Sequence, residues 1–231
     1  MTIGNELVSG DIVNTNGAWL AARLEELGFD VVAIAALPDD RERVAKFVRE
    51  QAQEANVVLV TGGLGGTPDD ITREAIAAAF EVPQEEQAEV AERLRARFSG
   101  DPDYVTRWAQ LPAGARPLEI PRGGAPGFVV GNVYVFPGLP GEMEPMFETI
   151  AGELAGARPI GAWRRTYRTT ESRIVAVLEA AGEHHPDVRV GSYPSFGAEG
   201  SAVEIVLKSS DPQALAAASA WLERELSQVF G

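Results

Sequence analysis

Cysteine is absent from the 231 residues of this chain. Disulfide bonds, thiolate metal sites and cysteine nucleophiles are therefore excluded, because each of them needs a thiol. Histidine is nearly as rare, since the chain has only the adjacent pair His184 and His185, which precedes a proline. We expect this pair in a solvated loop, although a two-histidine metal site is the alternative.

Lysine is scarce as well, and Lys46 and Lys208 are the only two. The chain has 20 basic and 34 acidic residues, which gives a formal net charge of −14. Such a surface would repel nucleic acid or an anionic membrane, so we expect neither as a main partner. An anionic ligand would have to be held by a local site.

Long apolar runs are also missing. No run approaches the length needed to span a bilayer, and the N-terminus lacks the basic-then-apolar order of a signal peptide. These absences predict a cytoplasmic protein. The length and the apolar fraction of 45% suit a chain that buries a substantial core, in one large domain or in one medium and one small domain.

The stretch 57–72 is the most informative part of the sequence. Val57–Val60 is an apolar run without polar alternation, which predicts a strand covered on both faces in a parallel sheet. A helix is predicted over Thr72–Phe80. Between them lie four glycines that can adopt positive φ and open backbone N–H groups to an anion: Gly62, Gly63, Gly65 and Gly66. Open α/β sheets bind phosphates at such strand–loop–helix junctions.

Two aspartates, Asp69 and Asp70, lie between this loop and the helix. Beside a bound phosphate they would repel it unless a divalent cation lay between, so the pair predicts Mg²⁺ or a similar hard metal. The alternative is that both aspartates, with Thr72, cap the helix and that the glycines only form a tight turn. Glycine spacing by itself does not decide between these interpretations.

Strand–helix alternation over the first half predicts a three-layer αβα sandwich with a mainly parallel sheet. Asn14 and Asn16 precede the first predicted helix and are candidate caps for it. The other predicted elements are a strand over Asp30–Leu37, helices over Pro38–Glu54, Gln84–Phe98, Asp101–Gln110 and Glu142–Leu154, and a hairpin over Gly127–Phe136 with its turn at Gly131 and Asn132.

A domain boundary is predicted near residue 158, which gives one domain over 1–158 and a second over 159–231. Beyond this boundary, the βαββα order of the predicted elements favours a small α+β module. It has no basic stripe and no suitably placed GXXG clamp, so RNA binding is not expected. We expect it to serve in packing or dimerisation, and the protein to be a homodimer.

Residues 62–72 resemble the GGLGPTxDDxT signature of the CinA-like, molybdopterin-binding-domain family (a MoaB/Mog-like fold). Four more segments resemble motifs of this family: Ile3–Gly10, Asp11–Asn16, Gly124–Phe128 and Phe136–Met143. The resemblance covers nearly the whole chain, and the second domain is similar to the KH-like middle domain of longer members. The deamidase domain that follows there is absent from this sequence.

The chain departs from the family pattern at several places. Gly66 stands where the family usually has proline, Gly124 where it has threonine, and Pro121 where it often has asparagine. These changes predict a looser loop and a different choice of substrate. Met1–Gly4 resembles only the end of the family's first strand, so either that strand is short or the start codon is misassigned.

The resemblance implies a metal-dependent hydrolase of a nucleotide diphosphate, with ADP-ribose as the leading substrate and FAD next. Asp70, Asp69 and Glu6 are the catalytic candidates it implies, and Asp70 with Asp69 would hold Mg²⁺, Mn²⁺ or Co²⁺. The implied phosphate- or nucleotide-binding residues are Gly62, Gly63, Leu64, Gly65, Gly66, Thr67, Asn14, Gly138, Pro140 and Glu142. Capping remains the alternative role for Asn14, and a favourable interaction with the helix dipole the alternative role for Glu142.

Two other functions stay open. Relatives with the same fold use a similarly placed aspartate to bind a phosphorylated pterin, which implies a molybdopterin-binding protein of molybdenum cofactor metabolism. A non-catalytic nucleotide-binding module would keep the glycines but would have little need for two aspartates beside phosphate. In each case the expected partner is a small anionic nucleotide or pterin.

Overall fold

The computed structural model describes residues 1–98, 106–119, 121–154, 159–197 and 200–230. The chain divides into two compact units, an N-terminal one of Met1–Arg23 with Val31–Leu154, and a C-terminal one of Leu24–Asp30 with the residues from Ala155 onward. The predicted boundary at residue 158 and the first half of the predicted helix Asp101–Gln110, residues 101–105, lie outside the described residues.

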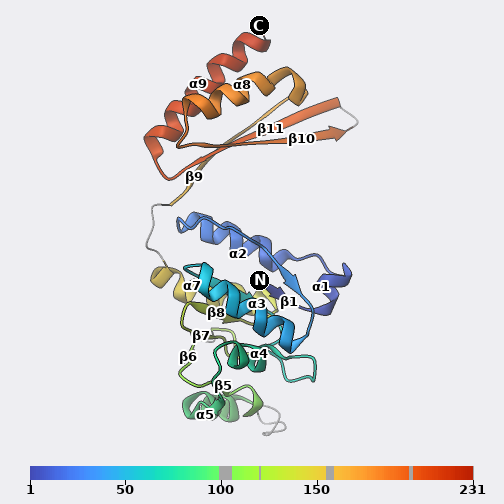
Figure 1. Ribbon diagram of the computed structural model, residues 1–231, viewed down its shortest axis with the longest axis vertical. Helices are drawn as coiled ribbons and strands as arrows, with labels where there is room; N and C mark the ends of the chain where they lie inside the picture. The colour runs from blue at the N-terminus through green and yellow to red at the C-terminus, as the bar shows by residue number, and fades with distance from the viewer. Residues whose placement is uncertain (99–105, 120, 155–158, 198–199, 231) are drawn as a thin grey trace. The chain divides into compact units, whose positions relative to one another are not determined.

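The N-terminal unit alternates strands and helices (Figure 1). Its described strands are β1 (Thr2–Ile3), β2 (Ala36–Leu37), β3 (Val58–Thr61), β4 (Gln84–Glu86), β5 (Gln110–Pro112), β6 (Arg116–Pro117), β7 (Phe128–Val130) and β8 (Val133–Phe136). Its described helices are α1 (Asn5–Ser9), α2 (Thr15–Glu26), α3 (Arg41–Glu54), α4 (Thr72–Ala79), α5 (Ala88–Arg97) and α7 (Pro140–Leu154).

The central sheet has the strand order β2-β1-β3-β8-β7-β6. The first four of these strands are parallel neighbours, whereas β7 runs antiparallel to both β8 and β6. The predicted hairpin is confirmed, because Val130 pairs with Val133 around a turn at Gly131, whose φ is +56°. The predicted mainly parallel α/β fold is confirmed as well.

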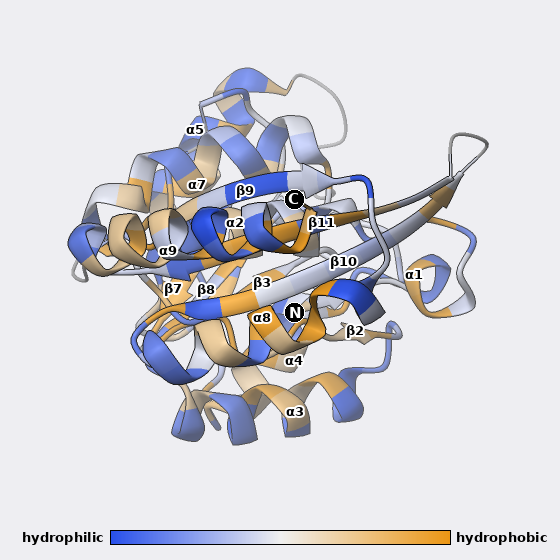
Figure 2. Ribbon diagram, turned by 90° about the horizontal axis from the view of Figure 1, so that it is seen from above, coloured by the Kyte–Doolittle hydropathy of each residue, from blue (hydrophilic) through white to orange (hydrophobic). Residues whose placement is uncertain are grey.

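Helices cover both faces of this sheet. Val58 and Val60 of β3 belong to the same core cluster as Val44 of α3 and Ile76 of α4. On the other face, Phe136 of β8 packs against Phe147 of α7, which also meets Trp19 of α2 edge to face. Because β3 is buried on both faces, its residues are apolar up to the final Thr61, whereas α3 alternates between hydrophobic and hydrophilic residues (Figure 2).

Two predicted elements of this unit differ from the structure. The strand expected over Asp30–Leu37 is limited to Ala36–Leu37, because the neighbouring β1 supplies partners only from Thr2 to Ile3. Val32, in the stretch before β2, is 81% exposed. The helix expected over Gln84–Phe98 begins only at Ala88, because the first three residues pair with β5 as an antiparallel ladder.

The C-terminal unit has the predicted βαββα order. Its described elements are β9 (Gly161–Tyr167), α8 (Glu171–His184), β10 (Arg189–Gly197), β11 (Gly200–Ser209) and α9 (Pro212–Phe230). The three strands form an antiparallel sheet of order β10-β11-β9, and α8 and α9 bury its apolar side chains, Ile205 and Leu207 among them. His184 ends α8 instead of lying in the expected loop, and its ring stacks on Trp221.

No described helix has the length and apolarity that crossing a membrane would require.

Candidate functional site

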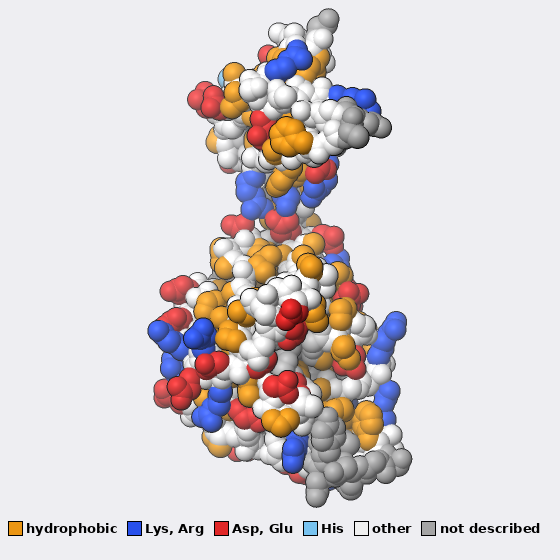
Figure 3. Space-filling model, turned by 90° about the vertical axis from the view of Figure 1, so that its right-hand side faces the viewer, with side chains coloured by type: hydrophobic (Ala, Val, Ile, Leu, Met, Phe, Trp, Pro, Cys, Tyr) orange, Lys and Arg blue, Asp and Glu red, His pale blue; other side chains and the backbone are white. Residues whose placement is uncertain are grey.

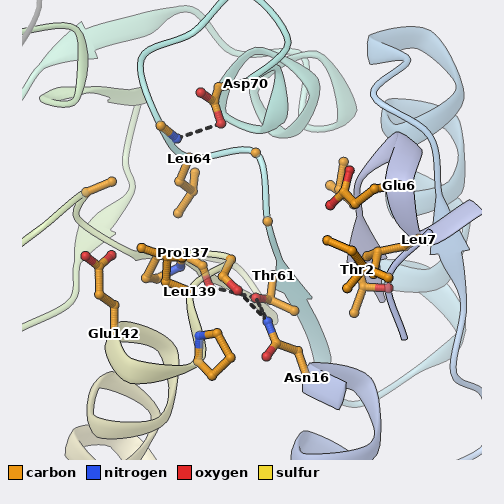
Figure 4. A pocket seen from close by; sticks show the side chains of 18 of the residues that line it. Thr2, Glu6, Leu7, Asn16, Thr61, Leu64, Asp70, Pro137, Leu139 and Glu142 are labelled. Atoms are coloured by element: carbon orange, nitrogen blue, oxygen red, sulfur yellow. Dashed lines mark hydrogen bonds between the residues drawn. The ribbon is translucent and has the colours of Figure 1, made fainter. Parts of the chain in front are cut away.

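A cavity of about 530 Å³ lies where the parallel strands β1, β3 and β8 end. The loops that follow these strands at their carboxyl ends supply its floor and walls, as in other open α/β sheets. Figure 3 shows the face of the N-terminal unit that carries α1, where acidic side chains lie among apolar and polar ones. Figure 4 shows the cavity from close by.

The glycine loop after β3 forms the floor of this cavity. Gly62 and Gly63 have φ of +105° and +64°, which side chains with a Cβ rarely adopt. Thr72, at the start of α4, holds both of them, since its Oγ1 donates to the Gly62 carbonyl at 2.8 Å and its N–H to the Gly63 carbonyl at 3.1 Å. The loop is therefore clamped to the helix that follows it.

Asp70 holds the other end of the glycine loop. Its Oδ1 accepts the Gly65 N–H at 2.8 Å, and its Oδ2 accepts both the N–H and the hydroxyl of Thr67, at 2.8 and 2.5 Å. The alternative of helix capping is not what the structure shows for Asp70, because α4 begins after Ile71 without a side-chain cap. A carboxylate has about four acceptor positions, so one position on Oδ1 remains for a further ligand.

Arg73 stabilises the glycine loop through the loop's carbonyl groups, and the sequence did not predict this role. This side chain is only 3% exposed, and its guanidinium donates to the Leu64 carbonyl at 2.6 Å and to the Gly65 carbonyl at 2.5 Å. A buried arginine needs such acceptors, because leaving its donors unmet costs several kcal/mol. Its place one residue after Thr72 carried no signal beyond good helix propensity.

Asn16 joins the end of β3 to the loop after β8. Its Nδ2 donates to the Gly138 carbonyl at 2.7 Å and to Thr61 Oγ1 at 3.3 Å, and Thr61 in turn donates to the Pro137 carbonyl at 2.7 Å (Figure 4). Asn14 accepts the Gly17 N–H at 2.9 Å, which is a capping interaction at the start of α2, and its Nδ2 donates to Thr2 Oγ1 of β1 at 2.9 Å. Both asparagines thus make contacts across the site, Asn14 to β1 and Asn16 to β3 and the loop after β8.

Acidic residues gather around the glycine loop. Burial raises the pKa of Asp39, while a hydrogen bond from the Asn5 N–H lowers it and the charges of Glu6, Asp69 and Asp70 raise it. Asp69 is exposed. Within the described part of the chain, no group of three or more His, Cys, Asp or Glu residues is arranged as a metal cage.

Glu142 faces the cavity from the first turn of α7 (Figure 4). Its carboxylate lies against Gly124, where a Cβ would overlap it, and Gly124 has a φ of +89°. Burial is the sole cause that raises the pKa of Glu142. Among the described residues its side chain has no hydrogen-bond donor and no ion-pair partner.

Replacing Glu142 with glutamine should raise the melting temperature at pH 7. A carboxyl whose pKa is raised on folding contributes its full stability below its ordinary pKa of 4.5, and this contribution is lost as the pH rises through the folded-state pKa. The neutral glutamine avoids that loss. Melting curves of both proteins between pH 4 and 8 test this, with Glu144→Gln on the same helix as the control. A variant that melts lower at pH 7 would contradict it.

The structure brings most of the predicted site residues to one cavity. Those that line it are Glu6, Asn14, Gly62, Gly63, Leu64, Gly65, Asp70, Gly138, Pro140 and Glu142. Gly66, Thr67 and Asp69 lie in the same loop but outside the lining. The lining also includes residues that the sequence did not single out, among them Leu7, Ile12, Val13, Trp108 and Leu139. Apolar side chains of this kind carry no pattern that separates a cavity wall from a core.

Comparison with known proteins matches both parts of the chain. The family described as "Probable molybdopterin binding domain" matches residues 1–156, and the one described as "FAD synthase, middle domain" matches residues 166–230. A protein of Archaeoglobus fulgidus is 40% identical over 200 residues, which cover 85% of both chains.

Several relatives are CinA-like proteins. One from Geobacter is 35% identical over 241 aligned positions, which cover 98% of this chain and 57% of the relative. One from Parasynechococcus marenigrum is 41% identical over 160 residues, and the match covers only 38% of its length. A solved structure of "the protein CinA with unknown function" from Thermoplasma acidophilum is 30% identical, with a TM-score of 0.63, over 67% of this chain and 96% of that one. This chain therefore belongs to the CinA-like family of molybdopterin-binding-domain proteins.

Proposed function

We propose that this protein hydrolyses the diphosphate of a nucleotide with the help of a divalent cation, with ADP-ribose as the leading substrate and FAD next. The observation that supports this most is that the cavity continues on both sides of the glycine loop. Residues 2–16 line one side and residues 124–142 the other (Figure 4). A diphosphate seated on the loop would leave one half of the ligand on each side.

The acidic residues fit a magnesium-like cation. Mg²⁺ is usually held by one or two carboxylates together with substrate phosphates and water, so a complete protein cage is not needed. Asp70 has an acceptor position left on Oδ1, and Asp69 is exposed beside it. Burial and, to a smaller extent, the charges of Glu6, Asp69 and Asp70 raise the pKa of Asp39, and a cation would relieve the repulsion between these charges.

Hydrolysis of ADP-ribose adds a water oxygen to one phosphorus, breaks the bond from that phosphorus to the bridging oxygen, and yields AMP and ribose 5-phosphate. A divalent cation at Asp70 would supply charge neutralisation and a lower pKa for the attacking water. Among the described residues the Glu6 side chain makes no hydrogen bond or ion pair, so we assign it the proton from that water. Gly62–Thr67 would position the phosphates.

The comparisons support a nucleotide as the ligand in one respect. Residues 166–230 match a domain named for FAD synthase, a protein that handles a flavin dinucleotide. FAD and ADP-ribose share the adenosine diphosphate group. This is support by family membership, and the activity itself needs a direct assay.

Incubation of the purified chain with ADP-ribose and with FAD, in the presence of Mg²⁺, Mn²⁺ or Co²⁺, should yield AMP and the second phosphorylated half. Chromatography of the products measures this, and a chelator should stop product formation. The chelator also serves as a control for contamination, because a contaminating phosphatase that needs no metal would stay active in its presence. If neither substrate is converted with any of the three metals, the proposal is wrong.

A phosphorylated pterin is the second candidate ligand, and the matching family's description as a probable molybdopterin-binding domain favours it. The same glycine loop would hold the phosphate, and the apolar walls would take the pterin ring. Binding of the pterin without turnover of either dinucleotide would favour this function. Nucleotide binding without turnover would instead indicate a non-catalytic module.

A further inference from the structure

One wall of the cavity differs in chemistry from the rest. On the side of the glycine loop formed by residues 124–142, the described lining consists of glycine, proline and apolar side chains with a single ionisable group, Glu142. Leu139 and Leu64 lie near it, and Trp108 from the segment before β5 belongs to the same lining (Figure 4). Glu6 lies on the opposite side of the loop.

Glu142 is a strong acceptor without a donor. At neutral pH a carboxylate offers only acceptor positions, and its half-buried place against Gly124 removes part of its water. Burial raises its pKa, as expected for a carboxylate that has lost water without gaining a donor. A ligand that brings hydroxyl or N–H donors to this position would compensate it.

The ligand group that donates to Glu142 must itself be uncharged or positive. A phosphate beside Glu142 would be repelled, so the phosphates belong on the glycine loop and the neutral part of the ligand belongs on this wall. A pair of adjacent hydroxyls suits a carboxylate well, because its two oxygens can each accept one. Acidic residues recognise ribose hydroxyls in this way in dinucleotide-binding α/β folds.

We propose that the Glu142 carboxylate accepts hydrogen bonds from the 2′- and 3′-hydroxyls of a ribonucleotide whose phosphate lies on the glycine loop. The site would then select ribonucleotides over deoxyribonucleotides. This inference rests on the proposed function for the placement of the phosphate. It concerns binding, however, and does not need hydrolysis to occur. The apolar side chains of the same cavity lining, Trp108 included, would then contact the base.

The test is calorimetric titration of the intact chain with AMP, 2′-deoxy-AMP and 2′,3′-dideoxy-AMP in the presence of Mg²⁺. The wild-type protein should bind AMP about tenfold to hundredfold more tightly than the dideoxy analogue, because hydrogen bonds to a charged group have effects of this size. The 2′-deoxy analogue should fall between them.

Glu142→Leu should weaken AMP binding by the same factor and leave the affinity for the dideoxy analogue unchanged or improved. Glu144→Gln, on the same helix but outside the cavity lining, should behave as wild type. Equal affinity of the wild type for all three nucleotides, equal weakening of all three by Glu142→Leu, or no nucleotide binding at all would overturn the inference. If only the proposed hydrolysis is wrong, the protein would still bind AMP more tightly than its deoxy analogues but would not convert ADP-ribose.

Discussion

Replacing Asp70 with asparagine should reduce ADP-ribose hydrolysis about hundredfold or more. The substitution removes the charge proposed to hold the cation, and it also disturbs the glycine loop. Asp70 accepts three hydrogen bonds through two oxygens. Asparagine keeps one acceptor oxygen and turns an NH₂ group toward either Gly65 or Thr67, whose groups are donors. Product formation measured at saturating metal and substrate tests this expectation.

Asp211→Asn is a matched control for this variant. Asp211 accepts the Gln213 N–H at 2.8 Å at the start of α9, in the C-terminal unit, and asparagine is an equally good capping residue. It should leave both activity and melting temperature unchanged. Full activity of Asp70→Asn would show that Asp70 has no part in the chemistry, and a lost activity with a lost melting transition would limit its role to folding.

The parts of the fold that the sequence predicted well are those fixed by local pattern. The apolar run before Gly62 is a strand because it is buried on both faces, and the turn at Gly131 is a hairpin because glycine accepts its positive φ. The βαββα order of the C-terminal unit followed from the same two signals. In each of these cases the information lies within a few neighbouring residues.

The parts that the sequence did not predict depend on partners far away in the chain. The strand over Asp30–Leu37 has suitable residues, but a strand exists only where a neighbour pairs with it, and β1 pairs over two positions. Gln84–Glu86 reads as helical by composition and forms a ladder with β5 instead. Such pairings override weak local propensity.

The candidate site shows the same division. Glycines and aspartates between a strand and a helix pointed to the loop that lines the cavity, because their chemistry is visible in the sequence. The role of each residue was not visible. Capping and metal binding were the two interpretations of Asp70, and the structure shows a third, in which Asp70 accepts the loop's own N–H groups. Arg73 donates to carbonyl groups of the same loop, and only the folded chain brings these groups together.

Replacing Gly62 with alanine should destabilise the N-terminal unit by about 3 kcal/mol or more, since two costs add. The φ of +105° is strained for any residue with a side chain, and a Cβ at this position would overlap the backbone carbonyl oxygen of Ile3. That oxygen belongs to β1 and cannot move without disturbing the sheet. For a chain of this size the melting temperature should fall by about 6 to 12 °C.

Gly152→Ala is the matched control for this last variant, because Gly152 is an exposed residue inside α7 with no atom near the position of an added Cβ. Alanine there should stabilise the protein by about 0.5 to 1 kcal/mol through its higher helix propensity. Opposite shifts for the same chemical change would assign the cost at Gly62 to its backbone conformation and to the contact with β1. A Gly62→Ala protein as stable as wild type would mean that the glycine loop has another accessible conformation, and the positions assigned to its N–H groups would then be wrong.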